Sequence, residues 1–428
     1  MFKRKISKFF IIVLILQFIS SLVYADEVTK QNIIKNRYNS LGGDINTEED
    51  IDSEEITKTS TQAQSNEELP KINSREAIVL DRKSKKIIFG KNENERVAMA
   101  STTKIMTATI IIENYNLEDE VIVSAKAAGI GGSRLGLKKN DKITVKHLLY
   151  GLMLCSGNDA AVALAEYAGG SVEGFADKMN DKANKLGLKD THFVTPHGLD
   201  DPEHYTTAYE LAILADYAMQ NETFAKIVRT KNATILINGY TKNIKNTNEL
   251  LGNLEGVNGI KTGFTNNAGR CLVTCTNRND FEIITVVLGA DAKKNRTEDS
   301  IKLIEYTYKN YKLIDITDTV NEKFKTWKTI NENRITVEKA RKDNKINLKY
   351  EKIINNIIPV KINEQEKIEI EIKCLYYLKA PIENGSIIGN MRVICNGELL
   401  EIVNIINTEK IEKKNKQDYF LEFLSSIA

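Results

Sequence analysis

The sequence has little cysteine, histidine, proline or tryptophan. It holds five cysteines, four histidines, five prolines and one tryptophan in 428 residues. Five cysteines are too few, and odd in number, for a fold stapled by disulfides. The cysteines form no CxxC pair and the histidines form no cluster, so the ligand spacings typical of zinc sites are missing. The sequence therefore excludes a disulfide scaffold and indicates neither a metal site nor a cofactor.

Two pairs of cysteines remain to be considered for a single bridge. Cys271 and Cys275 fall on one predicted strand. Four residues of strand rise separate their Cα atoms by about 13 Å, which is too far for a disulfide. A bridge between Cys374 and Cys395 is left open by the sequence.

An excess of charge of one sign is also missing. The 60 lysines and arginines are balanced by 58 aspartates and glutamates, for a formal net charge of +2. Such a chain has no overall field that would attract nucleic acid, so we expect no nucleic-acid partner and only local recognition of charged ligands. Hydrophobic residues make up 42% of the chain, which is ordinary for a globular protein of two or three domains.

The N-terminus has the residue pattern of an export signal. Four basic residues among the first eight precede 17 uncharged residues, 9–25. Val23 and Ala25 have the small-residue spacing of a signal peptidase site, which predicts a signal peptide over 1–25 with cleavage after Ala25. The alternative is an uncleaved membrane anchor, since this length is at the lower limit for a spanning helix. In both cases we expect the rest of the chain to be exported.

The next segments divide into a spacer and a folded domain. Residues 26–70 are acidic and polar, which predicts a disordered spacer. In the expected domain, 71–313, a predicted hairpin comes first, with EAIVLD and KKIIFGKN around RKSK. Helical spacing of apolar residues follows from 100 to 222, and then three extended runs and a closing helix. This order predicts an α+β fold whose antiparallel sheet takes strands from both ends of the domain.

The C-terminal part has a different texture. Residues 314–412 contain short alternating runs such as KIEIEIKC and SIIGNMRVIC, which predict a small all-β domain, as a sandwich. In residues 413–428 a basic lead-in precedes four apolar residues on one helical face. This predicts an amphipathic tail that associates with the membrane surface, and the alternative is a helix docked on the β domain. The residues are Lys413, Lys414 and Lys416, then Phe420, Phe423, Leu424 and Ile427.

Three short motifs could carry chemistry. Ser101 and Lys104 form an SxxK pair, one helical turn apart at the start of an apolar run. Ser156 and Asn158 follow 55 residues later in SGN, and the triplet KTG begins 105 residues after that, at Lys261. Each motif alone is weak: the serine could be a plain helix cap, SGN an ordinary turn and KTG a strand end. Their joint presence, once each and in this order, favours a common site.

At these residues the chain resembles the penicillin-recognising serine enzymes, whose signature elements have these residue types in this order. It is more closely similar to the low-molecular-weight D-alanyl-D-alanine carboxypeptidases, and the likeness covers roughly residues 74–414. It implies a β-lactamase/DD-peptidase-like fold, an enzyme at the outer face of the bacterial membrane, and peptidoglycan stem peptides as substrate. It also implies β-lactams as covalent inhibitors. Further matching phrases are GGSRLGLKKNDKITVKHLLYGLMLCSGNDAAVALAEY, FVTPHGLDDPEHYTTAYELA, NTNELL and LKAPIENGSIIGNMRV.

The residues themselves suggest how a nucleophile would be activated. Ser101 at a helix N-terminus lies in the positive end of the helix dipole. Lys104 can accept its proton only when the amine is neutral. We expect a nearby second cation, Lys261, in a site partly shielded from water, to lower the pKa of Lys104. Ser156 is expected to relay a proton to the leaving amine. Asn158 is expected to donate to the substrate backbone and to hold Lys104 in place.

The remaining assignments concern substrate binding. We expect Lys261 and Thr262 to face the terminal carboxylate and Gly263 to let its strand lie close to the substrate. The backbone N–H groups of Ser101 and Phe264 would form the oxyanion hole. Arg296 aligns loosely with an arginine that the resembled family keeps near the carboxylate site. His197 and His204 lie in a loop that either approaches the site or has a core or turn role.

Other functions are also compatible with the three motifs. A class A β-lactamase needs a deacylating glutamate in an ExxLN loop, and residues 157–260 contain no such match. A non-enzymatic wall- or penicillin-binding sensor would not require a nucleophile and its base, so the intact motifs argue against it. Transpeptidase and endopeptidase reactions would use the same residues, and only the family resemblance separates them from hydrolysis of a terminal D-Ala-D-Ala bond.

Overall fold

The computed structural model describes residues 69–341, 345–362 and 367–427. The predicted signal peptide, 1–25, and nearly all of the predicted spacer, 26–70, lie outside the described residues. Among the residues that are described, no helix has both the length and the apolar character needed to cross a membrane.

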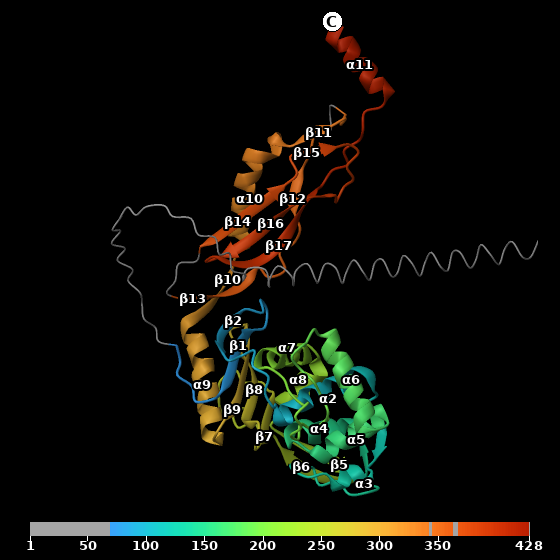
Figure 1. Cartoon of the computed structure of the whole chain (residues 1–428), viewed down its shortest axis with the longest axis vertical. Helices are drawn as coiled ribbons and strands as arrows, with labels where there is room; N and C mark the ends of the chain where they lie inside the picture. The colour runs from blue at the N-terminus through green and yellow to red at the C-terminus, as the bar shows by residue number, and fades with distance from the viewer. Residues whose placement is uncertain (1–68, 342–344, 363–366, 428) are drawn as a thin grey trace, which may run out of the picture. The chain divides into compact units, whose positions relative to one another are not determined.

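A five-stranded antiparallel sheet organises the region from 69 to 310 (Figure 1). Its order, β2-β1-β9-β8-β7, places the first hairpin beside the last three strands, as the sequence predicts. The strands are β1 (Glu76–Asp81), β2 (Ile87–Lys91), β7 (Lys261–Thr265), β8 (Gly269–Arg278) and β9 (Phe281–Ala290).

Both faces of this sheet are covered, and this explains the sequence of β1. All six residues of β1 are buried, and because both faces are covered the strand shows no alternation of apolar and polar residues. Ala77 and Val79 pack toward α9 (Lys293–Asn310), which lies along one face of the sheet in Figure 1. Ile78 and Leu80 face the larger group of helices on the other side.

Helix α2 lies at the centre of that group of helices and contacts α4 to α8. Its first eight residues, Lys104 to Ile111, are all buried, so its polar N-terminal residues are enclosed together with its apolar ones. The elements are η1 (Ala100–Thr103), α2 (Lys104–Asn114), α3 (Ala125–Gly129), α4 (Val145–Leu154), α5 (Asn158–Gly169), α6 (Val172–Lys185), α7 (Ala208–Met219) and α8 (Glu222–Arg229).

The first turn of α5 is tied to the preceding loop by one buried carboxylate. Asp159 is fully buried and accepts hydrogen bonds from the backbone N–H groups of Leu135, Gly136 and Leu137 at 2.7 to 2.9 Å. Hydrogen bonds to an ionised acceptor are stronger than neutral ones. This carboxylate therefore fixes the 135–137 segment beside the SGN turn, where Asn158 begins α5.

Two small hairpins and two short helices were not predicted from the sequence. The hairpins pair β3 (Glu120–Ile122) with β4 (Lys142–Thr144), and β5 (Asn232–Ile237) with β6 (Tyr240–Lys245). Strands of three to six residues with mostly exposed side chains carry little periodic signal. Helices α3 and α8, of five and eight residues, are too short to show a clear helical period in the sequence.

The C-terminal region has its own hydrophobic core and is rich in strands, as predicted, with one helix added. Helix α10 (Thr317–Asn331) contributes Val320 and Phe324 to this core. Together with Trp327 these residues follow helical spacing, which the sequence analysis passed over. The strands are β10 (Tyr311–Asp315), β11 (Thr336–Glu338), β12 (Leu348–Tyr350), β13 (Ile357–Lys361), β14 (Ile368–Cys374), β15 (Tyr377–Lys379), β16 (Ile387–Cys395) and β17 (Glu398–Asn407), with η2 (Glu332–Arg334) after α10.

Strand β10 spans the boundary expected between 313 and 314. It pairs along its whole length with β13, while the main sheet of the region has the order β12-β17-β16-β14. The chain thus enters the C-terminal sheets before residue 314.

The structure answers the question about the cysteines. Cys374 pairs with Gly389, and Cys395 pairs with Ile368, so the two cysteines occupy opposite ends of the β14–β16 ladder. Six residues of strand rise keep them far beyond disulfide distance. None of the five cysteines, all of which the structure describes, forms a disulfide.

The predicted tail is helical. Helix α11 (Lys416–Ile427) has no buried residue. Phe420, Phe423 and Ile427 each expose more than 60% of their surface, and Leu424 exposes 47%. An exposed apolar face on an amphipathic helix is typical of a surface that contacts a membrane or a partner.

Candidate active site

Ser101 and Lys104 lie where the 3-10 turn η1 leads into α2. The amine Nζ of Lys104 is 2.8 Å from Ser101 Oγ, so the SxxK residues are in direct hydrogen-bond contact. Nζ also donates to Asn158 Oδ1 and to the carbonyl oxygen of His197, both at 2.8 Å. The structure therefore joins the first two motifs around one amine, and adds a backbone acceptor that the sequence analysis missed.

These three contacts constrain the neutral amine. A carbonyl oxygen and the Asn158 amide oxygen can only accept, whereas a serine hydroxyl can donate or accept. The amide is oriented by its nitrogen, which donates to the Gly131 carbonyl at 2.7 Å. A neutral Lys104 has two N–H donors, for Asn158 and His197, and one lone pair. That lone pair then points at the hydroxyl of Ser101, which is the arrangement of a base and a nucleophile.

The electrostatic environment favours the neutral form of Lys104. Burial is the larger cause that brings the pKa of Lys104 well below its ordinary value, and the charge of Lys261 is the second. The leading role expected for Lys261, in a site only partly shielded from water, is wrong because Lys104 is completely enclosed. Burial, with a smaller effect from Arg296, also lowers the pKa of Lys261 to about 7.

A cleft of about 670 Å³ opens above this amine. Lys104 and Lys261 expose 0% and 1% of their surface and lie behind its wall. Lys261 Nζ donates to the carbonyl of Thr262, whose hydroxyl bonds that of Thr247 at 2.7 Å. The residues that line the cleft are Ser101, Ser133, Ser156, Lys231, Lys245, Asn246, Thr247, Asn248, Glu249, Leu251, Asn253, Thr262, Gly263, Phe264, Arg270, Lys293 and Arg296.

Two backbone features shape the floor of the cleft. Ser156 lies in the turn between α4 and α5, adopts a left-handed conformation with φ of 61°, and lines the cleft. A Cβ on Gly263 would come within 3.2 Å of Ser101 N and of Ala100 Cβ. The glycine of KTG thus lets β7 lie directly against the turn that carries Ser101. The close approach expected between Gly263 and the substrate is thus made to the Ser101 turn.

Arg296 reaches the cleft from α9. It is 3% exposed, and its Nη2 donates to Glu249 Oε1 at 2.7 Å. Its Nε is buried without a hydrogen-bond partner. Glu249 belongs to NTNELL, which carried part of the family resemblance but received no role from the sequence. Pairing between residues 47 positions apart leaves no local pattern to find.

The outer part of the cleft is formed by Phe264, which is 47% exposed. The guanidinium carbon of Arg270 lies 3.6 Å from the centre of its ring, a cation–π contact. Asn158, in contrast, does not line the cleft, since its amide nitrogen bonds Gly131. Its expected donation to the substrate stays a prediction, while its contact with Lys104 is present.

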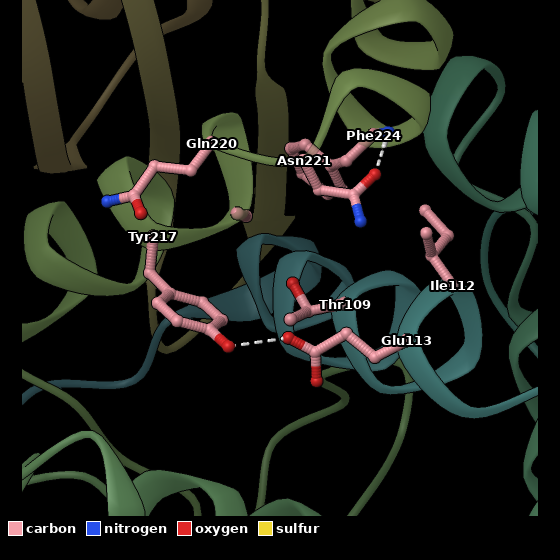
Figure 2. Close-up of a pocket in the computed structure, with 8 residues that line it drawn as sticks. Thr109, Ile112, Glu113, Tyr217, Gln220, Asn221 and Phe224 are labelled. Carbon is pink, nitrogen blue, oxygen red and sulfur yellow. Dashed lines mark hydrogen bonds between the residues drawn. The ribbon is translucent and has the colours of Figure 1, made fainter.

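A second, smaller cavity of about 210 Å³ lies at the other end of α2 (Figure 2). Its polar centre is Tyr217, whose hydroxyl donates to Glu113 at 2.7 Å, and Lys182 bonds both side chains. The opening contains none of the predicted site residues, which gather at the N-terminus of α2.

Comparisons with known proteins agree with this geometry. A family model described as D-alanyl-D-alanine carboxypeptidase matches residues 60–292, and a model of the C-terminal domain of penicillin-binding protein 5 matches 324–413. D-alanyl-D-alanine carboxypeptidase DacF of Bacillus subtilis is 34% identical over 357 residues, which are 82% of this chain and 88% of the relative. DacA of Haemophilus influenzae is 30% identical over 356 residues, 78% of this chain and 84% of the relative.

Solved structures lead to the same group of proteins. Penicillin-binding protein 5 from Haemophilus influenzae superposes with a TM-score of 0.66 at 27% identity, covering 81% of this chain and 99% of that one. The Streptomyces K15 DD-transpeptidase gives 0.54 at 34% identity, covering 55% and 97%. The predicted α+β, DD-peptidase-like fold is confirmed. The chain belongs to the family of serine-type D-alanyl-D-alanine carboxypeptidases, enzymes that act on peptidoglycan.

Proposed function

We propose that the protein hydrolyses the terminal D-Ala-D-Ala bond of peptidoglycan stem pentapeptides through an acyl-enzyme on Ser101, releasing D-alanine. The observation that carries this proposal is the 2.8 Å contact between Ser101 Oγ and the enclosed amine of Lys104. A hydroxyl nucleophile needs an adjacent base that is unprotonated at working pH, and the lowered pKa of Lys104 supplies one.

In the first step Lys104 takes the proton of the Ser101 hydroxyl while Oγ bonds the carbonyl carbon of the penultimate D-alanine. The carbonyl oxygen becomes an oxyanion, for which the backbone N–H groups of Ser101 and Phe264 are the proposed donors. Support comes from Gly263, which brings β7 within van der Waals distance of Ser101 N. Preorganised donors of this kind are often the largest contribution to catalysis.

The terminal carboxylate of the substrate is proposed to bind beside Thr262, with Arg296 and Lys261 supplying positive charge. Arg296 has an unpartnered buried Nε and lines the cleft, while Lys261 lies just behind Thr262. A carboxylate bound here would raise the pKa of Lys261 from about 7 and so restore its charge. That charge in turn disfavours protonation of Lys104.

Collapse of the intermediate breaks the C–N bond. Ser156, which lines the cleft, is proposed to pass the proton held by Lys104 to the leaving nitrogen, so that D-alanine departs as a neutral amine. A water then attacks the ester carbonyl carbon and gives one proton to Lys104. The bond between this carbon and Ser101 Oγ breaks, and Lys104 returns the proton to Oγ, so that the Ser101 hydroxyl and the neutral amine are both restored. Penicillin would enter by the same first step: its lactam C–N bond opens and its acyl group remains on Ser101.

The first prediction concerns the nucleophile. Ser101→Ala should lower D-alanine release from a D-Ala-D-Ala peptide by roughly 10⁴-fold or more, because no acyl-enzyme can form. It should also abolish covalent labelling by a fluorescent penicillin. Mass spectrometry of the labelled wild-type protein should place the adduct on the peptide that contains Ser101. Labelling of the alanine variant, or an adduct on another cleft serine such as Ser133, would contradict the proposal.

The second prediction concerns pH. Since only neutral Lys104 can act as base, the acylation rate constant at saturating penicillin should rise with pH as this amine loses its proton. Lys261→Met removes the neighbouring charge and raises the pKa of Lys104, so the acidic limb of the profile should move to higher pH. Stopped-flow measurements give the profile, with the exposed Lys294→Met as control. An unmoved limb, or one moved to lower pH, would show that Lys261 does not tune the base.

We further propose that the protein is exported through its predicted signal peptide and associates through α11 with the outer surface of the cytoplasmic membrane. The exposed apolar face of α11 and the lysines at its start, Lys413, Lys414 and Lys416, support this proposal. Such a helix lies in the interface with its apolar face among the acyl chains, and its lysines near anionic headgroups.

The third prediction tests this tail. Deleting the residues after Lys414 should abolish sedimentation of the protein with vesicles that contain anionic phospholipid, because the apolar face is lost. Penicillin labelling should be retained, since the cleft is built from residues 101–296. If the shortened protein still sediments with vesicles, the tail is not the membrane contact.

A further inference from the structure

The loop of residues 194–204, called the 194–204 loop below, makes hydrogen bonds to the end of η1 and the first turn of α2, which follow Ser101. Its His197 carbonyl accepts from Lys104, and its Pro196 carbonyl accepts from Thr107 Oγ1 at 2.7 Å. At its end, His204 Nε2 lies 2.8 Å from Thr103 Oγ1. Lys104 is already explained by the proposed chemistry. The contact between His204 and Thr103 is not, although both side chains are buried.

The direction of each hydrogen bond around His204 is fixed by its partners. The backbone N–H of Val194 donates to His204 Nδ1 at 3.0 Å, so Nδ1 is the unprotonated nitrogen. Nε2 then carries the ring proton and donates it to Thr103 Oγ1. The hydroxyl of Thr103 is left with its own proton, which it donates to the Ala100 carbonyl at 2.8 Å. The hydrogen bonds therefore run in one direction, from Val194 to Ala100.

This chain ends at an unusual backbone position. Ala100 has φ of 48°, in the left-handed region, and immediately precedes Ser101. A non-glycine residue holds this conformation only when its surroundings fix it, and such residues cluster at functional sites. The 194–204 loop lies flush against it: a Cβ on Gly198 would come within 1.9 Å of the Ala100 carbonyl oxygen.

We propose that His204 is a positioning residue for the reaction: acting through Thr103, it fixes the Ala100 carbonyl and so holds the turn that presents Ser101. The orientation of Ser101 Oγ toward Lys104, and of Ser101 N toward the cleft, both follow from the backbone of this turn. Burial lowers the pKa of His204 to about 4, so the ring stays neutral and the bond direction is kept at neutral pH. The inference rests on the proposed role of Ser101 as nucleophile.

The test compares Thr103→Val with Thr103→Ser in the full chain. Valine keeps the shape of threonine but removes the hydroxyl between His204 and Ala100, whereas serine keeps it. The rate constant of acylation by a fluorescent penicillin should fall roughly tenfold or more in the valine variant, because small misplacements of a reacting group cost at least that much. Its final labelling should remain complete, and the serine variant should react within about twofold of the wild type.

His204→Gln should slow acylation similarly, and the double variant His204→Gln/Thr103→Val should be no slower than either single variant, because both cut the same chain. His192→Gln is the matched control: this partly exposed histidine flanks the same loop, and its Nδ1 hydrogen-bonds the Glu203 carbonyl rather than Thr103. It should react at the wild-type rate.

Three results would overturn the proposal. One is a wild-type acylation rate in Thr103→Val. The second is reduced final labelling with an unchanged rate, which would mean that the hydroxyl supports folding alone. The third is rate losses that add in the double variant. The failure of the proposed function is a different result: Ser101→Ala would then still be labelled, whatever the rates of the Thr103 variants.

Discussion

The site depends on one enclosed contact, that between the amine of Lys104 and the hydroxyl of Ser101. A lysine amine in water is protonated and cannot act as a base, and burial is what lowers its pKa here. Burying an amine without partners is costly, so the fold supplies two acceptors, the Asn158 amide oxygen and the His197 carbonyl. With both acceptors occupied, the lone pair of a neutral amine is directed at Ser101. The proposed nucleophile and base are thus arranged by hydrogen-bond geometry as much as by charge.

Much of the first folded region can be understood as the enclosure of that contact. Helix α2 lies among five other helices, so its first turn is shielded from water although it carries a lysine. The edge strand β7 closes the other side, which is possible because Gly263 has no side chain to collide with the Ser101 turn. The 194–204 loop closes a third side and contributes both His197 and His204. Segments far apart in the sequence therefore contribute to one amine's surroundings, and this explains why the motifs are separated by 55 and 105 residues.

The sequence predicted the helices and strands whose apolar residues recur with a regular period, and the residues that belong to the three motifs. The hairpin β1–β2, the helices with apolar spacing, the strands β7 to β9 and the joining of Ser101, Lys104 and Asn158 were all foreseen. Features that depend on backbone atoms or on distant partners were not. The His197 carbonyl leaves no side-chain signal, and the pairing of Arg296 with Glu249 has no local pattern. The sequence indicated partial shielding of Lys104 but not that burial outweighs the charge of Lys261, because periodicity shows which face of a helix is apolar but not that a polar turn is fully enclosed.

The most direct test of this account is the protonation state of Lys104 itself. In protein labelled with ¹⁵N at the lysine amines, the Nζ signal that is lost in Lys104→Arg can be followed by NMR as the pH is raised. The account predicts that this amine loses its proton well below the ordinary lysine pKa of 10.5. A signal that remains protonated until the pH approaches 10.5 would contradict it, because Ser101 would then have no base beside it.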